Sequence, residues 1–379
     1  MNNKINNNSL IKSNNFFKKI DINVNKLDDG KKRTFQNRTL ISIYVFIYYI
    51  LVILFSFFSD ETQVSKLIIK DSFPESFKIV FSILYLFIIY APFVIAMIEI
   101  NRFIFGRNWK TLVGILISGT LFFFLPNLSY LSFKYLGLFN DKVPIAFYSS
   151  ELDGKINELN KIRLFFGTIL ASMLITIIVM NVMLGFTKLN NFKNVLTLNF
   201  IMFIVPFGFM SFGIIGLLKS WVVLLFIFFS VVFTDASCYI VGLMFGKTKM
   251  APAISPNKTW EGAIGGSIIA IIGLMVYSSL WKIDATNVGF KTLSIFASAK
   301  DWVNWIWILC TSITLVVISI MGDLTFSYIK RNFNIKDYGT ILKSHGGILD
   351  RVDSLVFVTS TYAAILFVVS SMVNWNLFG

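Results

Sequence analysis

Nine apolar stretches, each about 20 residues long and nearly free of charged side chains, constrain this chain more than any other feature. A helix of about 20 residues crosses the hydrocarbon core of a bilayer, where backbone groups must form hydrogen bonds within their own segment. The sequence therefore predicts an all-α, polytopic integral membrane protein with about nine transmembrane helices. The stretches lie at 40–59, 79–98, 111–133, 164–186, 196–218, 221–246, 262–281, 304–323 and 354–377.

The composition excludes most soluble proteins. Of the 379 residues, 56% are hydrophobic and only 14% are charged, whereas soluble domains have about 25% charged residues. The net charge of +14 does not form a nucleic-acid-binding patch, because the basic residues are divided between a tail and short loops. Cys238 and Cys310 lie inside apolar runs, which favours simple packing over a disulfide framework. We expect no nucleic acid among the partners.

The distribution of basic residues predicts an orientation. If the polar segment 1–38 is cytoplasmic, 22 Lys and Arg residues lie on the cytoplasmic side and 12 on the other. Cytoplasmic loops carry the excess of these residues, so the prediction is N-in and C-out, and it depends mainly on the tail. We expect 1–38 to be a disordered cytoplasmic tail, with contact to anionic headgroups as the alternative, and 39–379 to be one membrane domain.

Ionisable residues inside or beside the spans indicate functional positions, because charges in lipid are costly. Asp235 lies in the middle of 221–246, and Tyr239 and Gly242 follow it on the same helical face. A structural hydrogen bond to a neighbouring helix is the alternative for Asp235. Glu99 and Asp323 lie at the ends of spans, where we expect access to water.

The loop from Gly246 to Gly262 gathers several groups that can bind phosphate. Ser255-Pro256 predicts a turn, and Lys258 with Thr259 offers a cation and a hydroxyl group. An ordinary basic cytoplasmic loop remains the alternative for this segment.

The segment 322–353 holds five basic residues, four aspartates and the single histidine, His345. Aspartates bind Mg²⁺ through hard oxygen ligands, while Lys and Arg neutralise phosphate groups. Gly346-Gly347 allows backbone amides to approach an anion. This mixture favours a site for a metal and a polyphosphate, although a lone histidine is more often structural. One histidine and two cysteines inside apolar runs do not predict a zinc site.

Three ordered blocks of the sequence resemble the CDP-diacylglycerol synthases (phosphatidate cytidylyltransferases). The resemblance covers about 120 residues of the C-terminal half. The blocks are Asp235 with Tyr239 and Gly242; Ser255-Pro256 with Lys258-Thr259-Trp260-Glu261-Gly262; and Gly322-Asp323-Leu324 with Ser327, Lys330-Arg331, Lys336-Asp337, His345-Gly346-Gly347 and Asp350-Arg351-Val352-Asp353.

The resemblance implies that CTP and phosphatidate react to give CDP-diacylglycerol and pyrophosphate in a catalytic part at about 230–355, at the cytoplasmic face of the cell membrane. It implies Mg²⁺ held by Asp323 and Asp350, and leaves open a second monovalent or divalent cation and a homodimer. The implied catalytic residues are Asp323, Lys330, Arg331, Lys336, Asp337, His345, Asp350, Arg351 and Asp353. The implied substrate-binding residues are Asp235, Tyr239, Ser255, Lys258, Thr259, Glu261, Ser327, Gly346 and Gly347.

The sequence departs from the family pattern at three positions. Phe326 stands where the family commonly has Glu, Lys343 stands where Pro is usual, and Cys238 replaces a small Ala. Three alternatives therefore remain: another CTP-using membrane lipid enzyme, such as a polyprenol kinase; a polytopic transporter with an ion site at Asp235; and a catalytically inactive paralogue.

Overall fold

A computed structural model describes the chain at residues 29–59, 75–106, 108–135, 167–179, 181–182, 192–218, 221–281, 301–339, 341 and 346–376. Its long helices are α2 (Asp29–Ser59), α4 (Glu75–Phe105), α5 (Trp109–Tyr135), α7 (Phe192–Leu218), α8 (Trp221–Phe245), α9 (Trp260–Leu280), α10 (Asp301–Asn332) and α11 (Leu349–Asn376). A shorter apolar helix spans Gly167–Val179. The strands are β1 (Lys249–Ala251) and β2 (Ser255–Thr259).

Each of the nine apolar stretches coincides with one of these helices, which confirms the predicted all-α membrane architecture. Within the described part of the chain, six helices are long and apolar enough to cross a membrane. The total of nine spans and the N-in, C-out orientation stay predictions.

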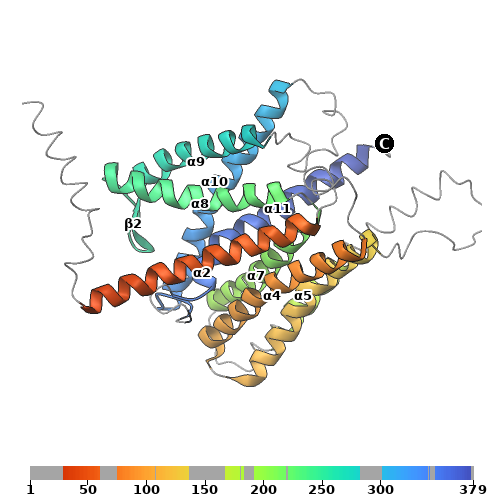
Figure 1. Cartoon of the computed structure of the whole chain (residues 1–379). Helices are drawn as coiled ribbons and strands as arrows, with labels where there is room; N and C mark the ends of the chain where they lie inside the picture. Colours follow the sequence, from red (N-terminus) through yellow and green to blue (C-terminus); the bar gives the residue numbers. More distant parts are fainter. Residues whose placement is uncertain are drawn as a thin grey trace, which may run out of the picture.

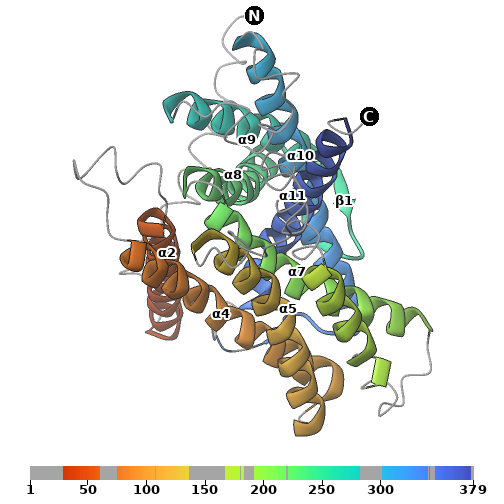
Figure 2. The same cartoon turned by 90° about the vertical axis from the view of Figure 1, so that its right-hand side faces the viewer.

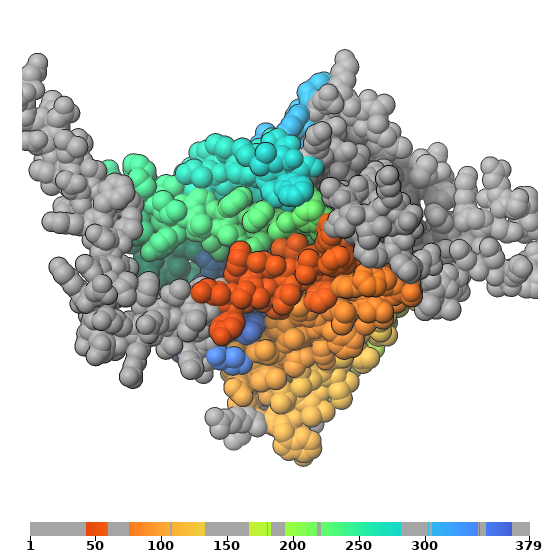
Figure 3. Space-filling model, viewed as in Figure 1, coloured from red at the N-terminus to blue at the C-terminus, as the bar shows by residue number. Residues whose placement is uncertain are grey.

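The helices form two groups joined by α11. In Figures 1 and 2, α8, α9 and α10 lie above, α2, α4, α5 and α7 lie below, and α11 passes between them. One face of the molecule shows α9, α8, α2 and α4 as successive bands (Figure 3). A single large core cluster takes buried residues from both groups, from Val52 on α2 to Tyr362 on α11.

Helices α8 and α9 pack closely because their contact is lined by glycine. A Cβ on Gly262 would lie 2.8 Å from the carbonyl oxygen of Cys238 and 2.8 Å from the Cα of Gly242. Small residues allow helix backbones to approach in this way in membrane proteins. The predicted packing role of Cys238 agrees with its position, since its Sγ lies 3.9 Å from the carbonyl oxygen of Ala263.

Helices α2 and α10 extend well beyond the predicted boundaries. Helix α2 begins at Asp29, so its first turns include the end of the segment expected to be a disordered tail. Helix α10 continues to Asn332, nine residues past the expected end at 323. Once an apolar span is helical, each further residue adds one backbone hydrogen bond at little cost, and so polar flanks can continue the helix.

The loop between α8 and α9 folds into an antiparallel β-hairpin in which Lys249 pairs with Thr259 and Ala251 with Ser255. The prediction of a turn at Ser255-Pro256 is wrong. The turn precedes these residues, and the N–H of Ile254 donates to the carbonyl oxygen of Ala251 at 3.1 Å. Pro252 occupies the second position of this turn, where a fixed φ is favourable.

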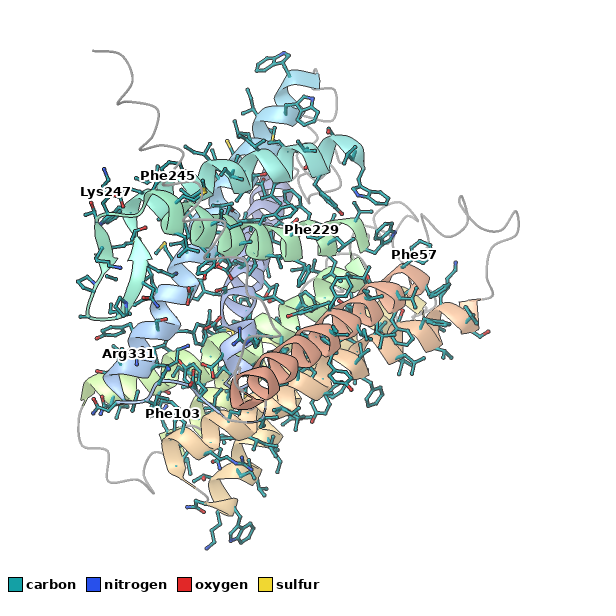
Figure 4. The ribbon with its side chains drawn as sticks, turned by 60° about the vertical axis from the view of Figure 1, so that its left-hand side comes forward. Phe57, Phe103, Phe229, Phe245, Lys247 and Arg331 are labelled. Atoms are coloured by element: carbon teal, nitrogen blue, oxygen red, sulfur yellow. The ribbon has the colours of Figure 1, made fainter. Side chains whose placement is uncertain are left out.

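Four segments that the charge count predicts to be cytoplasmic meet at one end of the bundle. The ring of Phe103 lies 4.8 Å from that of Phe333, and Asn332 donates to Asn194 at 3.1 Å. Figure 4 shows Phe103, Arg331 and Lys247 at this end and Phe57 toward the other. At the opposite end, Trp221 contacts both Phe57 and Trp281. The bundle thus places the predicted functional segments together at one of its ends.

Candidate active site

Helix α10 presents one polar face at this end of the bundle. Asp323, Ser327 and Lys330 are spaced four and three residues apart, so they share a helical face. The hydroxyl of Ser327 donates to Oδ1 of Asp323 at 3.4 Å. The continuation of α10 past the expected boundary therefore aligns the acidic and basic residues of the third sequence block.

The β-hairpin brings a lysine onto that face. The Nζ of Lys258, on β2, lies 2.5 Å from Oδ2 of Asp323. The two side chains are 26% and 31% exposed, so water and a soluble ligand can reach the pair. The second and third sequence blocks thus meet through a direct ion pair.

A second, more buried ion pair joins α10 to α11. The Nζ of Lys330 lies 3.0 Å from Oδ1 of Asp350 and 3.7 Å from Oδ2 of Asp353. Its side chain is only 13% exposed, and the ring of Tyr338 lies 5.3 Å from Nζ. One lysine thus neutralises part of the charge of two carboxylates at the start of α11.

The other oxygen of Asp350 is held by the backbone. Oδ2 accepts the N–H of Tyr338 at 2.9 Å and that of Gly347 at 2.8 Å. Gly346 has a φ of 79°, and a Cβ there would lie 2.9 Å from the same oxygen. Glycine is required at this position because other residues rarely adopt such a φ.

Asp235 belongs to the same group of charges. Its carboxylate interacts electrostatically with Asp323 and Lys258, and Asp353 interacts with both Asp323 and Asp235. Tyr239, one turn further along α8, is 68% exposed on the outer surface of the bundle. The structure thus brings Asp235 into the cluster and leaves Tyr239 at its edge.

We call Asp235, Asp323, Asp350, Asp353, Lys258 and Lys330 the carboxylate–lysine cluster. Its four carboxyl groups outnumber its two ammonium groups, and carboxylate oxygens are ligands that suit a divalent cation. Within the described residues, no three His, Cys, Asp or Glu side chains are grouped to enclose a metal. Mg²⁺ commonly binds one or two carboxylates and completes its shell with water and substrate phosphates. Asp323 fits such a role well because it is partly exposed.

Two predicted substrate-binding residues have structural partners in the hairpin. Glu261 accepts the N–H groups of Lys247 and Thr248 at 3.0 and 3.1 Å, which ties the start of α9 to the end of α8. Thr259 caps α9, since its hydroxyl oxygen accepts the N–H of Gly262 at 3.2 Å. Ser255 begins β2. These contacts hold Lys258 in place beside Asp323.

Arg331 also connects segments. Its Nε donates to the carbonyl oxygen of Ile254 in the hairpin turn at 3.2 Å, and its Nη1 donates to that of Ile335 at 3.3 Å. Lys336, Asp337 and Arg351 are exposed around the cluster. The predicted residue His345, like Lys343, lies outside the described residues.

The departure at position 326 has a structural explanation. Phe326 is fully buried, and its ring centroid lies 6.2 Å from that of Tyr338 in an edge-on arrangement. The hydroxyl of Tyr338 donates to the carbonyl oxygen of Phe326 at 3.2 Å, and burial raises the pKa of this phenol. Phe326 thus supports the segment between α10 and α11 from the core, without entering the carboxylate–lysine cluster.

The environment of Glu99, which lies at this end of the bundle, also differs from the prediction. The expectation that water reaches it is wrong, because its side chain is 1% exposed. Its carboxylate accepts the N–H of Ile348 at 3.0 Å and that of Leu349 at 2.9 Å. A carboxylate at the N-terminus of a helix stabilises the helix dipole and the free N–H groups.

Comparison with known proteins gives a consistent result. A sequence model described as the cytidylyltransferase family matches residues 77–369. Among curated relatives, a phosphatidate cytidylyltransferase from Haemophilus influenzae is 36% identical over 125 residues, which cover 33% of this chain and 38% of the relative.

Two further relatives carry the same name. The protein from Brucella abortus is 40% identical over 111 residues, or 29% of this chain and 34% of the relative. The protein from Rickettsia bellii is 39% identical over 127 residues, or 34% of this chain and 48% of the relative. The aligned segments therefore span less than half the length of these curated relatives.

Proposed function

Because the chain belongs to the cytidylyltransferase family, we propose that it transfers a cytidylyl group from CTP to phosphatidate. The products are pyrophosphate and CDP-diacylglycerol, and CDP-diacylglycerol serves phospholipid synthesis. The curated relatives named phosphatidate cytidylyltransferase support this choice of substrates. A polyprenol kinase-like enzyme and a transporter are less consistent with those names.

The observation that carries the proposal is the meeting of all three sequence blocks in the carboxylate–lysine cluster. Lys258 from the hairpin and Lys330 from α10 reach it from different segments. Joining two anionic phosphates requires neutralisation of their charges and in-line positioning. Lys258 and Lys330, held in ion pairs at this end of the bundle, supply positive charge at two defined positions.

In the proposed reaction, an oxygen of the phosphatidate phosphate attacks the α-phosphorus of CTP. A new P–O bond forms, the bond from the α-phosphorus to the oxygen bridging to the β-phosphorus breaks, and its electron pair leaves with pyrophosphate. The nucleophile needs no strong base because the lipid phosphate is already ionised near neutral pH. Lys258 donates to phosphate oxygens from the exposed side, and Lys330 from the buried side. Arg331 holds the hairpin turn over α10.

The residues fit a divalent cation, as judged from the carboxyl groups of the cluster. Asp323 would hold it through its exposed carboxylate. Asp350 is the second predicted ligand, and it would offer Oδ1, the oxygen that pairs with Lys330. Bound Mg²⁺ would polarise the phosphates and stabilise the charge that develops on the leaving pyrophosphate.

The location follows from the two substrates. Phosphatidate stays in the bilayer and CTP in water, so the site must lie at the membrane surface. The chain is a multi-pass membrane protein, and we place the cluster at the cytoplasmic face, where CTP is synthesised and where the charge count assigns these segments. Membrane lipids are thus partners on every side of the bundle, and a homodimer remains open.

The position of the transferred label tests the reaction class. Purified protein in detergent receives CTP labelled at the α- or the γ-phosphate, together with phosphatidate, with Mg²⁺ or with EDTA. The proposal predicts that α-label enters the lipid and γ-label leaves in pyrophosphate, only when Mg²⁺ is present. A parallel reaction contains a polyprenol in place of phosphatidate. Transfer of the γ-label to that polyprenol would instead identify a kinase.

A further inference from the structure

Glu99 is the carboxylate of the N-terminal half that reaches the start of α11. It lies on α4, near the end of the helix, and is separated from its partners Ile348 and Leu349 by about 250 residues of sequence. Each of its oxygens accepts one of the two N–H groups, at 3.0 and 2.9 Å. These are among the N–H groups that a helix leaves without internal partners.

The segment that Glu99 holds is the one that orients Asp350. The N–H of Gly347, directly before the two amides bound by Glu99, donates to Oδ2 of Asp350 at 2.8 Å. Oδ1 of Asp350 in turn lies 3.0 Å from Nζ of Lys330. A shift of this short backbone segment would therefore move the carboxylate and change its contact with the lysine.

The fit around Glu99 is tight. A Cβ on Gly347 would lie 2.5 Å from Oε1 of Glu99, and a Cβ on Gly339 would overlap the same atom. The backbone on both sides of the undescribed residues 342–345 thus packs directly against this carboxylate. Glu99 fills the space between α4 and the segment connecting α10 to α11.

We propose that Glu99 is a positioning residue for cytidylyl transfer. Its carboxylate fixes the first turn of α11, so that Asp350 and Asp353 stay directed at Lys330. Glu99 itself touches neither substrate, and it gives the N-terminal half of the chain a direct part in shaping the site. The catalytic part of this inference rests on the proposed function, while the structural part does not.

The first variant is Glu99→Gln, which keeps the size of the side chain but replaces one acceptor oxygen with an NH₂ group. One backbone N–H then faces a donor. We expect hydrogen–deuterium exchange at residues 346–350 to become faster. We expect kcat to fall roughly 10- to 100-fold, because displacements near 1 Å at a reacting centre cost about 100-fold. The KM for CTP should stay within about threefold, since Glu99 does not bind the nucleotide.

The matched control is Asn101→Ala. Asn101 lies two residues away on the same helix, is 2% exposed, and accepts a hydrogen bond from the hydroxyl of Thr111 at 2.8 Å. Loss of this hydrogen bond weakens the contact of α4 with α5 but does not change the contacts at the start of α11. We expect unchanged kcat and unchanged exchange at 346–350. A fall in kcat as large as that of Glu99→Gln would show that any polar loss on α4 impairs the enzyme, and would overturn the inference.

A second variant, Gly339→Ala, displaces Glu99 while keeping its charge, and should reproduce the fall in kcat. Normal kcat and normal exchange in Glu99→Gln would overturn the inference. If neither variant folds, exchange in the wild type decides: slow exchange at Ile348 and Leu349 supports the contact, and fast exchange contradicts it. If the wild type makes no CDP-diacylglycerol, the proposed function fails, and the exchange data still test the contact.

Discussion

Lys258 and Asp323 form an ion pair of 2.5 Å between the β-hairpin and helix α10. Both side chains are partly exposed, so this pair contributes little to the stability of the fold, about 0–1 kcal/mol. Its importance lies in placing a partly exposed cation next to a carboxylate, at the surface where we propose that the nucleotide binds. Function and stability should therefore respond differently when the pair is removed.

Lys258→Met should lower kcat/KM for CTP about 100-fold or more, because the loss of one donor to a reacting phosphate has a cost of this order. The melting temperature in detergent should change little. Lys247→Met is the matched control, since it removes the same charge from an exposed position between α8 and the hairpin. Steady-state kinetics of both variants test this prediction. Equal losses in the two would mean that only the net charge of the hairpin matters.

Lys330→Met should destabilise the protein by about 3–5 kcal/mol, because it leaves Asp350 and Asp353 buried without their cation. Adding Asp353→Asn should restore part of that stability by removing one uncompensated charge, while activity stays lost. Chemical unfolding followed by intrinsic fluorescence measures the first effect, and the transfer assay measures the second. Recovery of activity in the double variant would contradict the assigned role of Lys330.

Gly346→Ala should impair activity more than Gly106→Ala does. Both glycines have positive φ, at 79° and 68°, so alanine introduces a backbone strain of about 1–2 kcal/mol at each. A Cβ on Gly106 meets nothing within 4 Å, whereas one on Gly346 would meet Oδ2 of Asp350. Parallel measurement of unfolding and kcat separates strain from displacement. Matching activities in the two variants would show that Asp350 tolerates the shift.

Phe326→Glu should prevent stable folding, although glutamate is common at this position in the family that the chain resembles. Phe326 has no exposed surface, and its neighbours are aromatic and aliphatic, so a carboxylate there would be buried without a partner. Phe326→Leu keeps the apolar contact and should cost only about 1–2 kcal/mol. Size-exclusion chromatography measures the yield of folded protein for the two variants. An active, well-folded glutamate variant would show that the surrounding core can rearrange.

The helices could be predicted from sequence because lipid leaves the backbone few alternatives. Long runs without charged residues, such as 196–218 and 262–281, were predicted to be helices, and both are helical. The three motif blocks could also be predicted, since their residue types and spacing are distinctive. In the structure, the second and third blocks meet through the ion pair of Lys258 and Asp323.

Other features depend on contacts between distant parts of the chain, which no local pattern encodes. Glu99 was predicted to be accessible to water because it lies at the end of a span. Its partners, Ile348 and Leu349, are far away in sequence, so no local pattern shows that they bury it. The turn of the hairpin lies a few residues before the predicted Ser255-Pro256, because Pro252 rather than Pro256 occupies it. The extension of α10 to Asn332 was missed because the apolar run ends at 323, while the helix continues through the charged residues that follow.

The most direct test of the account is the formation of CDP-diacylglycerol from CTP and phosphatidate by the purified wild type and by Asp323→Asn. The account predicts lipid product from the wild type in the presence of Mg²⁺. It predicts a loss of about 100-fold or more in the variant, which should keep its fold because Asp323 is partly exposed. No product from the wild type, or equal rates in the two proteins, would contradict a cytidylyl-transfer site built around the carboxylate–lysine cluster.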